Sequence, residues 1–549
     1  MNGKWITAHW FALLMSLVIL VAVGARVWGF GSVPGSLYWD EVAMLVDARS
    51  IAATGKDMHG LPLSLLLPSY GDYKLPVYTW LSTPITLLAV SPEAQIRLIS
   101  LLAGLGSVLI SGLLAVELVS PKDRLQRRVL FLSVLFVTAI LPWSIHFSKV
   151  GFEGHLAQFL VALSLYCVLL ARRRPWMLLV AGLIGVLGLF TYYSVRFVWP
   201  VMAVATWLYV WRLHTMVLKK WLLLGVGMLF LFGMGFLAMA NSEWYGASQQ
   251  FRLSSPSLLS IEPFVQEQNV AREAAGNGLI SRILLHRSVF QAKALLANVA
   301  AHLSPVYLFV CGDSNLRHGT GFNGLGYLTM LPLLVLGVYW AIRSNSHLAA
   351  LLGVWWLISL IPASVPLEAP HALRSLNALM PFSIFIGFGL AWILNRRNTF
   401  LSVFVCGLLL LHLWQFLGFY NTTYAVNSLP AWQAGYKDVA ISLYEQHKGV
   451  DQAWMSIDDR WYLWYLVYGE KDIAFAQSLQ TKDFKPSQLG DNIQLNSWPS
   501  LTNFVAGKTY ILAGSEEKVN NTLDGLDVEV VFNDSSEGLR VVKFIYASK

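Results

Sequence analysis

The sequence predicts an all-α, multi-pass membrane protein that carries a small α/β domain at its C-terminal end. Of its 549 residues, 56% are hydrophobic and only 13% are charged, and the mean hydropathy is +0.55. Soluble domains rarely combine such length with so little charge. After Phe419 the composition becomes that of an ordinary soluble domain, which predicts the separate C-terminal part.

Apolar segments recur along the first 420 residues, each close to the length of about 20 residues that a helix needs to cross a bilayer. The first segment is expected to remain in the mature chain as an anchor, because many further spans follow it. The sequence thus predicts a transmembrane domain over residues 1–420. We expect about eleven spans, at residues 11–21, 98–118, 129–147, 155–171, 176–191, 197–211, 221–240, 327–342, 348–363, 376–394 and 399–418.

Basic residues predict the orientation, because Lys and Arg prefer short cytoplasmic loops. The basic clusters are Pro121 to Arg128, Arg172 to Arg174, Arg212 with Lys219 and Lys220, Arg343, and Arg396 with Arg397. All of them fall on one face if residues 74–92 form a helix at the outer interface instead of a further crossing. The outer face then carries residues 29–96, a long loop at about 241–326, and everything after Phe419. We expect a multi-pass membrane protein whose chemistry takes place on the extracytoplasmic face.

The net charge of +8 does not predict nucleic-acid binding, because the basic residues lie mainly in the short loops between spans. The three cysteines predict neither a disulfide nor a cysteine metal site. Cys167 and Cys406 fall within apolar spans, and Cys311 has no partner on its own face.

Residues 421–549 predict a small α/β domain on the outer face. Residues 430–447 have the pattern of an amphipathic helix, and three short β-branched runs follow at 509–512, 528–532 and 539–545. Turn formers bound each run, which indicates strands.

The first outer loop contains adjacent carboxylates in the stretch LYWDEV, at Asp40 and Glu41, and then Asp72 and Lys74 in YGDYKLP. An ionisable side chain at the membrane border is expensive unless it is paired or functional. Asp40 has two interpretations: it caps a helix that starts at Glu41, or it is a catalytic carboxylate. Both can hold at once.

Three further outer loops carry unusual polar residues. Lys149, Glu153 and His155 form either a local ion pair with a polar helix end or part of a substrate site. Arg374 lies outside against the orientation rule, next to His371, and either snorkels to lipid headgroups or binds phosphate. The stretch CGDSNLRHGTGFNG, which includes Asp313, suits a loop that approaches a ligand closely.

In the order of these elements the chain resembles the GT-C class of membrane glycosyltransferases. It looks most like the bacterial branch of protein O-mannosyltransferase-like and lipid A aminoarabinose transferase-like enzymes, which implies a location in the bacterial plasma (inner) membrane. The matching elements, over residues 1–420, are Asp40-Glu41, Lys74 with Pro76, Arg97-Leu98, Phe152-Glu153, Gly312-Asp313 to Arg317-His318, and Pro370 to Ser375. The family often has a doubled Pro where this chain has Leu75-Pro76, and commonly Asp where it has Glu153.

The resemblance implies transfer of a sugar from a polyprenyl-phosphate carrier to a hydroxyl of a protein, lipid or glycan acceptor, at a membrane whose lipids also contact the protein. A carboxylate would remove the hydroxyl proton and cations would stabilise the departing phosphate. The expected roles are Asp40 as base with Glu41 in support, Lys74, Arg374 and His371 for the carrier phosphate, and Glu153, Asp72 and Asp313 for sugar or acceptor. A single displacement would invert the anomeric centre.

No cofactor and no obligatory metal are predicted, because Lys74 and Arg374 can supply the positive charge. Two other functions stay open. One is a flippase or transporter of lipid-linked glycans, although its polar residues would be expected near mid-membrane. The other is a polymerase or ligase that uses a whole lipid-linked oligosaccharide.

Overall fold

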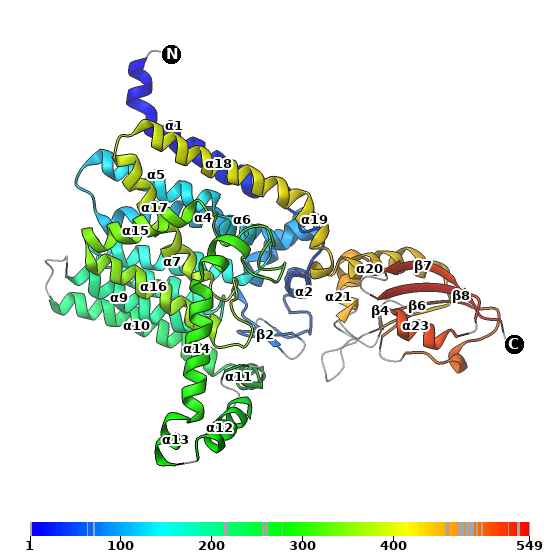
Figure 1. Ribbon diagram of the computed structural model, residues 1–549. Coiled ribbons are helices and arrows are strands. Elements are labelled where there is room, and N and C mark those ends of the chain that lie inside the picture. The colour runs from blue at the N-terminus through cyan, green and yellow to red at the C-terminus, as the bar shows by residue number, and fades with distance from the viewer. Residues whose placement is uncertain are drawn as a thin grey trace. The chain divides into compact units, whose positions relative to one another are not determined.

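The computed structural model describes residues 3–547, except 63, 70–71, 213–217, 255–256, 259–261, 277, 457–459, 470–476, 478–487, 490–491, 496–497, 525 and 535–537 (Figure 1). The chain divides into two compact units. The first, here called the helical unit, comprises Met1–Trp28 and Ser100–Tyr420. The second, here called the mixed unit, comprises Gly29–Ile99 and Asn421–Lys549, so the first outer loop groups with the C-terminal domain.

Every predicted span corresponds to a helix. These are α1 (Gly3–Val27), α4 (Pro92–Val119), α5 (Arg124–Ile140), α7 (Glu153–Leu170), α8 (Met177–Leu189), α9 (Val195–Trp211), α10 (Leu218–Ala240), α15 (Met330–Ser344), α16 (Ser346–Ser364), α17 (Leu379–Asn395) and α18 (Thr399–Asn421). Among the described residues, 7 helical stretches are long and apolar enough to cross a membrane, and α8, α9 and α15 are shorter apolar helices. The prediction of a multi-pass, mostly helical membrane protein is confirmed.

Residues 74–92 contain two short pieces, α3 (Val77–Ser82) and the 3₁₀-helix η1 (Thr83–Leu87). Pro84 opens η1 where a long helix would otherwise continue. At a rise of about 1.5 Å per residue, α3 is roughly 9 Å long, well short of the hydrocarbon core of a bilayer. The segment is therefore no further span, as the orientation argument requires.

Two glycines let α15 and α17 pack backbone to backbone. A Cβ atom on Gly389 would lie 1.9 Å from the carbonyl oxygen of Leu333, and one on Gly337 would lie 1.7 Å from that of Phe385. Small residues at such contacts allow membrane helices to approach closely. α17 is almost wholly buried, so this contact lies at the centre of the bundle.

Gly389→Ala is expected to destabilise the protein by about 1–3 kcal/mol, because the added methyl overpacks a contact made by backbone atoms. The matched control is Gly407→Ala in α18, where a Cβ meets nothing within 4 Å. Thermal unfolding in detergent, followed by intrinsic fluorescence, compares the two variants. Equal midpoints for Gly389→Ala and Gly407→Ala would contradict the packing argument.

The long loop between α10 and α15 is largely helical, not irregular. It contains α11 (Tyr245–Ser254), α12 (Glu262–Ala274), α13 (Leu279–Leu284), α14 (Arg287–Leu303) and the π-helical turn η2 (Tyr307–Cys311). Figure 1 shows α14 leading away from the packed spans, with α12 and α13 at its far end. In chain order α14 runs from this far end back toward the bundle, where η2 and the loop with Asp313 follow it.

In the mixed unit, the first outer loop folds as α2 (Trp39–Thr54) followed by the antiparallel strands β1 (Leu67–Ser69) and β2 (Asp72–Lys74). The register pairs Leu67 with Lys74, and α2 packs against α3 and η1. Among the described residues of both units, the remaining short elements are α6 (Pro142–Phe147), α19 (Thr423–Asn427), η3 (Leu376–Ala378), η4 (Pro430–Trp432), η5 (His447–Gly449) and η7 (Leu501–Asn503).

The C-terminal sheet has the strand order β4-β5-β3-β6-β8-β7. Its strands are β3 (Gln452–Met455), β4 (Gln488–Leu489), β5 (Ile493–Gln494), β6 (Thr509–Ser515), β7 (Glu529–Asp534) and β8 (Leu539–Ile545), with helices α20 (Ala434–Gln446), α21 (Tyr462–Tyr468) and α23 (Glu516–Thr522). β3 pairs in parallel with β5 and β6, and the other pairs are antiparallel. The predicted amphipathic helix corresponds to α20, and the three predicted strands to β6, β7 and β8.

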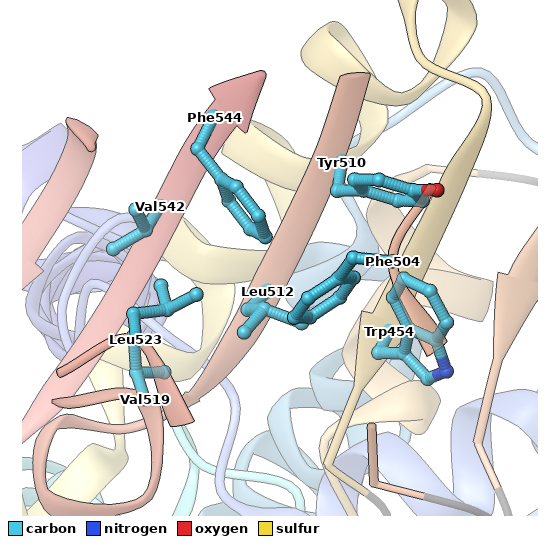
Figure 2. Close-up of a cluster of buried hydrophobic side chains, with 8 residues drawn as sticks. All are labelled: Trp454, Phe504, Tyr510, Leu512, Val519, Leu523, Val542 and Phe544. Atoms are coloured by element: carbon cyan, nitrogen blue, oxygen red, sulfur yellow. The ribbon is translucent and has the colours of Figure 1, made fainter. Parts of the chain in front are cut away.

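The sheet has an aromatic-rich core on one face (Figure 2). Tyr510 and Leu512 lie two residues apart on β6, and Val542 and Phe544 lie two residues apart on β8. The register pairs Tyr510 with Phe544 and Leu512 with Val542, so all four side chains point to the same side. The ring of Phe504 lies 5.0 Å from that of Tyr510 and 5.1 Å from that of Phe544, between centroids. This core explains how a tail of ordinary composition folds beside a membrane domain.

Candidate functional site

Asp40 and Lys74 form an ion pair in the mixed unit. Lys74 Nζ donates to Asp40 Oδ1 over 2.6 Å. α2 places Asp40 in its first turn, and the end of β2 supplies Lys74. The Lys74 side chain is 7% exposed and that of Asp40 is 33% exposed, so the carboxylate is the accessible member of the pair.

The alternative in which Asp40 caps a helix starting at Glu41 is wrong. α2 begins at Trp39, and Tyr38 is its N-cap residue. Glu41 closes the cap instead, because its Oε2 accepts a hydrogen bond of 3.1 Å from the Tyr38 backbone N–H. Asp40 is left with the electrostatic benefit of the helix N-terminus but without a capping role.

Glu41 is held in a buried two-point ion pair with Arg97. Arg97 Nε donates to Glu41 Oε1 over 2.8 Å, and Nη2 donates to Oε2 over 2.9 Å. Both side chains are 0% exposed. Two of the three remaining guanidinium hydrogens go to the carbonyls of Pro34 and Ser36, so Arg97 contacts the chain both before and after the N-cap residue of α2. The geometry makes Glu41 a positioning residue beside Asp40.

Farther along α2, Asp47 is fully buried. Its Oδ1 accepts a hydrogen bond from the Met58 backbone N–H, while its Oδ2 has no hydrogen-bond partner. Burial raises the pKa of Asp47 well above its ordinary value, and the charge of Asp57 adds to the rise. This carboxyl group therefore keeps its proton to a higher pH in the folded protein than in the unfolded chain.

The raised pKa of Asp47 predicts a pH-dependent stability. An unfolded aspartate titrates near pH 3.9, so above that value the folded state binds more protons and stability falls as pH rises. In Asp47→Asn this decline is removed, and the amide oxygen can still accept from Met58. The unfolding midpoint of Asp47→Asn is expected to change less than that of the wild type between about pH 5 and about pH 8.

The exposed Asp524, in the C-terminal domain, provides the matched control for this measurement. Asp524→Asn should follow the wild-type curve. Parallel curves for the wild type and Asp47→Asn would rule out a protonated Asp47.

A second polar cluster lies in the helical unit, where the loop after η2 meets the loop before α17. Asp313 joins the two loops: its Oδ1 accepts from Asn315 N over 2.9 Å and its Oδ2 accepts from Ala372 N over 2.8 Å. Burial raises the pKa of Asp313. His371 Nδ1 lies 4.0 Å from Asp313 Oδ2, so the fold brings together two candidate residues from separate loops.

His371 and Arg374 differ in charge. Burial lowers the pKa of His371 to about 2, with the charge of Arg374 as a further cause, so its imidazole is neutral at physiological pH. His371 can therefore bind phosphate only as a hydrogen-bond donor. Arg374 is 33% exposed, and its Nη2 lies 3.6 Å from Glu368 Oε2.

The side chain of Lys149 contacts the backbone just after the end of α1. Its Nζ donates to the Trp28 carbonyl, and it lies 4.4 Å from the centre of the Tyr420 ring. Burial lowers the pKa of Lys149 to about 7. Glu153 is the first residue of α7 and is half-buried. The N-terminus of the helix stabilises its negative charge.

Sequence reasoning missed three partners. Arg97 was seen only as the start of a span, although an arginine at a membrane border calls for a counter-charge. Glu93 pairs with Lys437 over 2.7 Å, which links α4 to α20. His302 Nε2 accepts the backbone N–H of His371, and no local pattern could have signalled this contact across 69 positions.

The predicted residues thus divide between the two units. Asp40, Glu41, Asp72 and Lys74 lie in the mixed unit, and Glu153, Asp313, His371 and Arg374 lie in the helical unit. Asp72 is half-buried and accepts a hydrogen bond from the Tyr73 backbone N–H. Each unit brings at least one acidic and one basic group together, an arrangement that suits proton removal beside a bound anion.

The chain has the GT-C fold of polytopic membrane transferases. ArnT from Cupriavidus metallidurans in the apo state matches with a TM-score of 0.53 at 14% identity, over 98% of both chains. The same enzyme bound to undecaprenyl phosphate matches with a TM-score of 0.51 at 14% identity, over 99% of this chain and 98% of that one. No protein-family model and no curated protein sequence matches.

A second similar structure comes from an archaeon. The oligosaccharyltransferase AglB from Archaeoglobus fulgidus, in complex with an inhibitory peptide and a dolichol-phosphate, matches with a TM-score of 0.50 at 13% identity. The match covers 84% of this chain and 64% of AglB, so this chain spans less than two thirds of that protein. Another structure of the archaeal enzyme, in complex with Zn and sulfate, matches with a TM-score of 0.51 at 12% identity, over 83% of this chain and 61% of that one.

Proposed function

We propose that this protein is a membrane glycosyltransferase that moves a monosaccharide from a polyprenyl-phosphate carrier to an acceptor hydroxyl on the extracytoplasmic face. The observation that carries the proposal is the pair of Asp40 and Lys74, a partly exposed carboxylate held 2.6 Å from a buried ammonium group in a GT-C fold. Acceptor activation needs a base, and the leaving phosphate needs a cation.

The step is a single displacement. The acceptor oxygen forms a bond to the anomeric carbon, its proton passes to Asp40, and the bond from the anomeric carbon to the phosphate oxygen breaks. The electron pair of that bond leaves with the polyprenyl phosphate, and the anomeric centre inverts. A phosphate that competes for Lys74 would free the Asp40 carboxylate from its ion pair, so donor binding would switch on the base.

Charge assigns the phosphate contacts. Lys74 and Arg374 are the proposed cations, and neutral His371 would add a hydrogen bond. Glu41 would act through its pair with Arg97, which fixes the first turn of α2 and hence the direction of Asp40. For sugar or acceptor we propose Glu153, Asp72 and Asp313, of which Asp313 already uses both oxygens to hold two loops together.

The carrier is proposed from the bound lipids of the similar structures. ArnT was solved with undecaprenyl phosphate and AglB with dolichol-phosphate. A lipid tail would keep the reacting phosphate at the depth of the helix ends, where the candidate residues are predicted to lie. Positive side chains can supply the charge stabilisation, so the proposed transfer requires no metal.

The test is to purify the protein, add a polyprenyl-phospho-monosaccharide in lipid vesicles, and follow the release of polyprenyl phosphate by mass spectrometry. Release that depends on an added acceptor supports the proposal, and NMR of the product should show an inverted anomeric linkage. Retention at the anomeric carbon would overturn the single displacement.

The same vesicles separate the alternatives. A polymerase or ligase would release carrier only from a lipid-linked oligosaccharide. A flippase would move the intact carrier between leaflets without cleaving it. Either result, with no cleavage of the monosaccharide carrier, would overturn the proposed function.

A further inference from the structure

Three buried electron-pair donors converge in the helical unit. Asp313 Oδ2 lies 3.8 Å from His318 Nδ1 and 4.0 Å from His371 Nδ1. One candidate ligand atom from each of the three residues lies within 4.8 Å of the other two. All three residues are buried, with exposures of 5%, 8% and 3% for Asp313, His318 and His371.

Both imidazoles place their Nδ1 atoms within 4.0 Å of the carboxylate oxygen. His318 Nδ1 is buried and has no hydrogen-bond partner. The backbone N–H of Arg374 approaches His371 Nδ1 at 3.4 Å, which marks that nitrogen as the acceptor of its ring. A cation between the three residues would bind these nitrogens and the carboxylate oxygen together.

The geometry points to a divalent transition-metal site, of the zinc class, formed by Asp313, His318 and His371. Two imidazole nitrogens and one carboxylate oxygen are a common catalytic zinc set, which leaves a fourth position open. Bonds of about 2.0–2.2 Å in a tetrahedral site separate neighbouring ligand atoms by roughly 3.3–3.5 Å. The distances of 3.8 and 4.0 Å from the carboxylate oxygen exceed this separation by a few tenths of an ångström, and the ligand atoms of the two histidines lie within 4.8 Å of each other.

The surroundings also suit a metal. Backbone N–H groups of Asn315 and Ala372 orient the Asp313 carboxylate. Glu368 Oε2 lies 3.9 Å from His371 Nε2, too far for a hydrogen bond, but its negative charge favours a cation nearby. Glu368 also pairs with Arg374, which offsets the nearby positive charge. The ion would bind the loop after η2 to the loop before α17, and its open position could accept an anionic oxygen.

The test measures metal, not sugar transfer, so it is independent of the proposed function. The full chain is purified with an affinity tag that contains no histidine, treated with a chelator, and incubated with zinc chloride. Metal content is then measured by plasma mass spectrometry after gel filtration. One equivalent of zinc per chain is expected, with a higher unfolding midpoint because the ion binds the folded state.

Variants His318→Gln and Asp313→Asn are compared with His347→Gln, which changes an exposed histidine outside the cluster. Loss of an outer hydrogen-bonding group already weakens metal binding by about 10–100-fold, so loss of a ligand should weaken it by at least as much. His347→Gln should retain the wild-type zinc content and the zinc-dependent midpoint. Equal zinc in the wild type and His318→Gln would overturn the site.

Cobalt substitution of the wild type keeps the proposal testable if a ligand variant does not fold. Cobalt(II) bound in a four-coordinate site with two imidazole ligands gives a visible band that is much stronger, and at longer wavelength, than the weak band of the hydrated ion. Wild-type protein that shows the band and loses it on addition of zinc supports the site. Protein without the band, and without zinc after gel filtration, overturns it.

Discussion

Asp40→Asn is expected to reduce sugar transfer by about 10²–10⁴-fold, the usual contribution of a general base. The amide has the same shape as the carboxylate and can still accept the hydrogen bond from Lys74 Nζ, so the first turn of α2 should keep its structure. The buried Lys74 loses its counter-charge but keeps a hydrogen-bond acceptor, so the unfolding midpoint should fall modestly. Transfer is measured as release of polyprenyl phosphate from the vesicles described above.

Two control variants, Asp40→Glu and Asp524→Asn, test whether the loss of transfer depends on the position of this one carboxylate. The longer glutamate keeps the charge but moves the carboxylate by one methylene, so transfer should fall less than in Asp40→Asn. Asp524→Asn neutralises an exposed carboxylate in the C-terminal domain and should leave transfer unchanged. A wild-type rate for Asp40→Asn would remove Asp40 from the chemistry.

Arg97→Leu is expected to lower the free energy of unfolding by about 3–5 kcal/mol, because it leaves the buried Glu41 carboxylate without its counter-charge. It also removes the donors to the carbonyls of Pro34 and Ser36. The measurement is a denaturant titration in detergent, with tryptophan fluorescence as the probe. Arg97→Lys keeps the positive charge but lacks the planar guanidinium. Its free energy of unfolding should lie between those of the wild type and Arg97→Leu.

The double variant Glu41→Leu/Arg97→Leu shows whether Arg97 stabilises the protein through its ion pair with Glu41 or through its other contacts alone. Removing both charges should recover part of the loss, since a buried pair can be replaced by apolar groups at little net change. Recovery is partial because the two carbonyls still lack their donor. Additive losses from Glu41→Leu and Arg97→Leu would mean that the two side chains do not interact.

The sequence predicted the elements of this fold better than their partners. Spans are recognised from length and hydropathy, and the strands at 539–545 and 509–512 from β-branched residues, because these are local properties. The helical content of the loop at 241–326 was missed, because its helices lack long apolar runs and contact few neighbours. The start of α2 was missed by two residues, because the cap depends on Glu41 and hence on Arg97, which lies 56 positions away.

The sequence indicates candidate site residues by their type and their position in a loop, but it does not indicate which of them are in contact. Lys74 and Asp40 stood out as charges at a predicted membrane border, and the structure pairs them. His318 did not stand out as a possible ligand, because only the fold brings it to Asp313 and His371. Long-range geometry of this kind is not written in any single stretch of sequence.

The grouping of residues 29–99 with the C-terminal domain rests on specific contacts. The Trp39 backbone N–H donates to Gln433 Oε1 over 3.0 Å, and Arg49 Nη1 donates to the Val467 carbonyl over 2.9 Å. Glu93 accepts from both Lys437 and the Tyr468 hydroxyl, over 2.7 and 2.8 Å. The helix that carries Asp40 is thus completed by residues that come almost four hundred positions later.

This order has a consequence for biosynthesis. The ribosome makes the loop with Asp40 early, but the side chains that complete its surroundings only with the last part of the chain. During the insertion of all the intervening spans the loop lacks Gln433, Lys437 and Tyr468, so its carboxylate and Lys74 cannot be held in their final frame. The loop would therefore reach its final structure only after residues 433–468 have been made, and a chain that stalls within the membrane domain would lack these contacts.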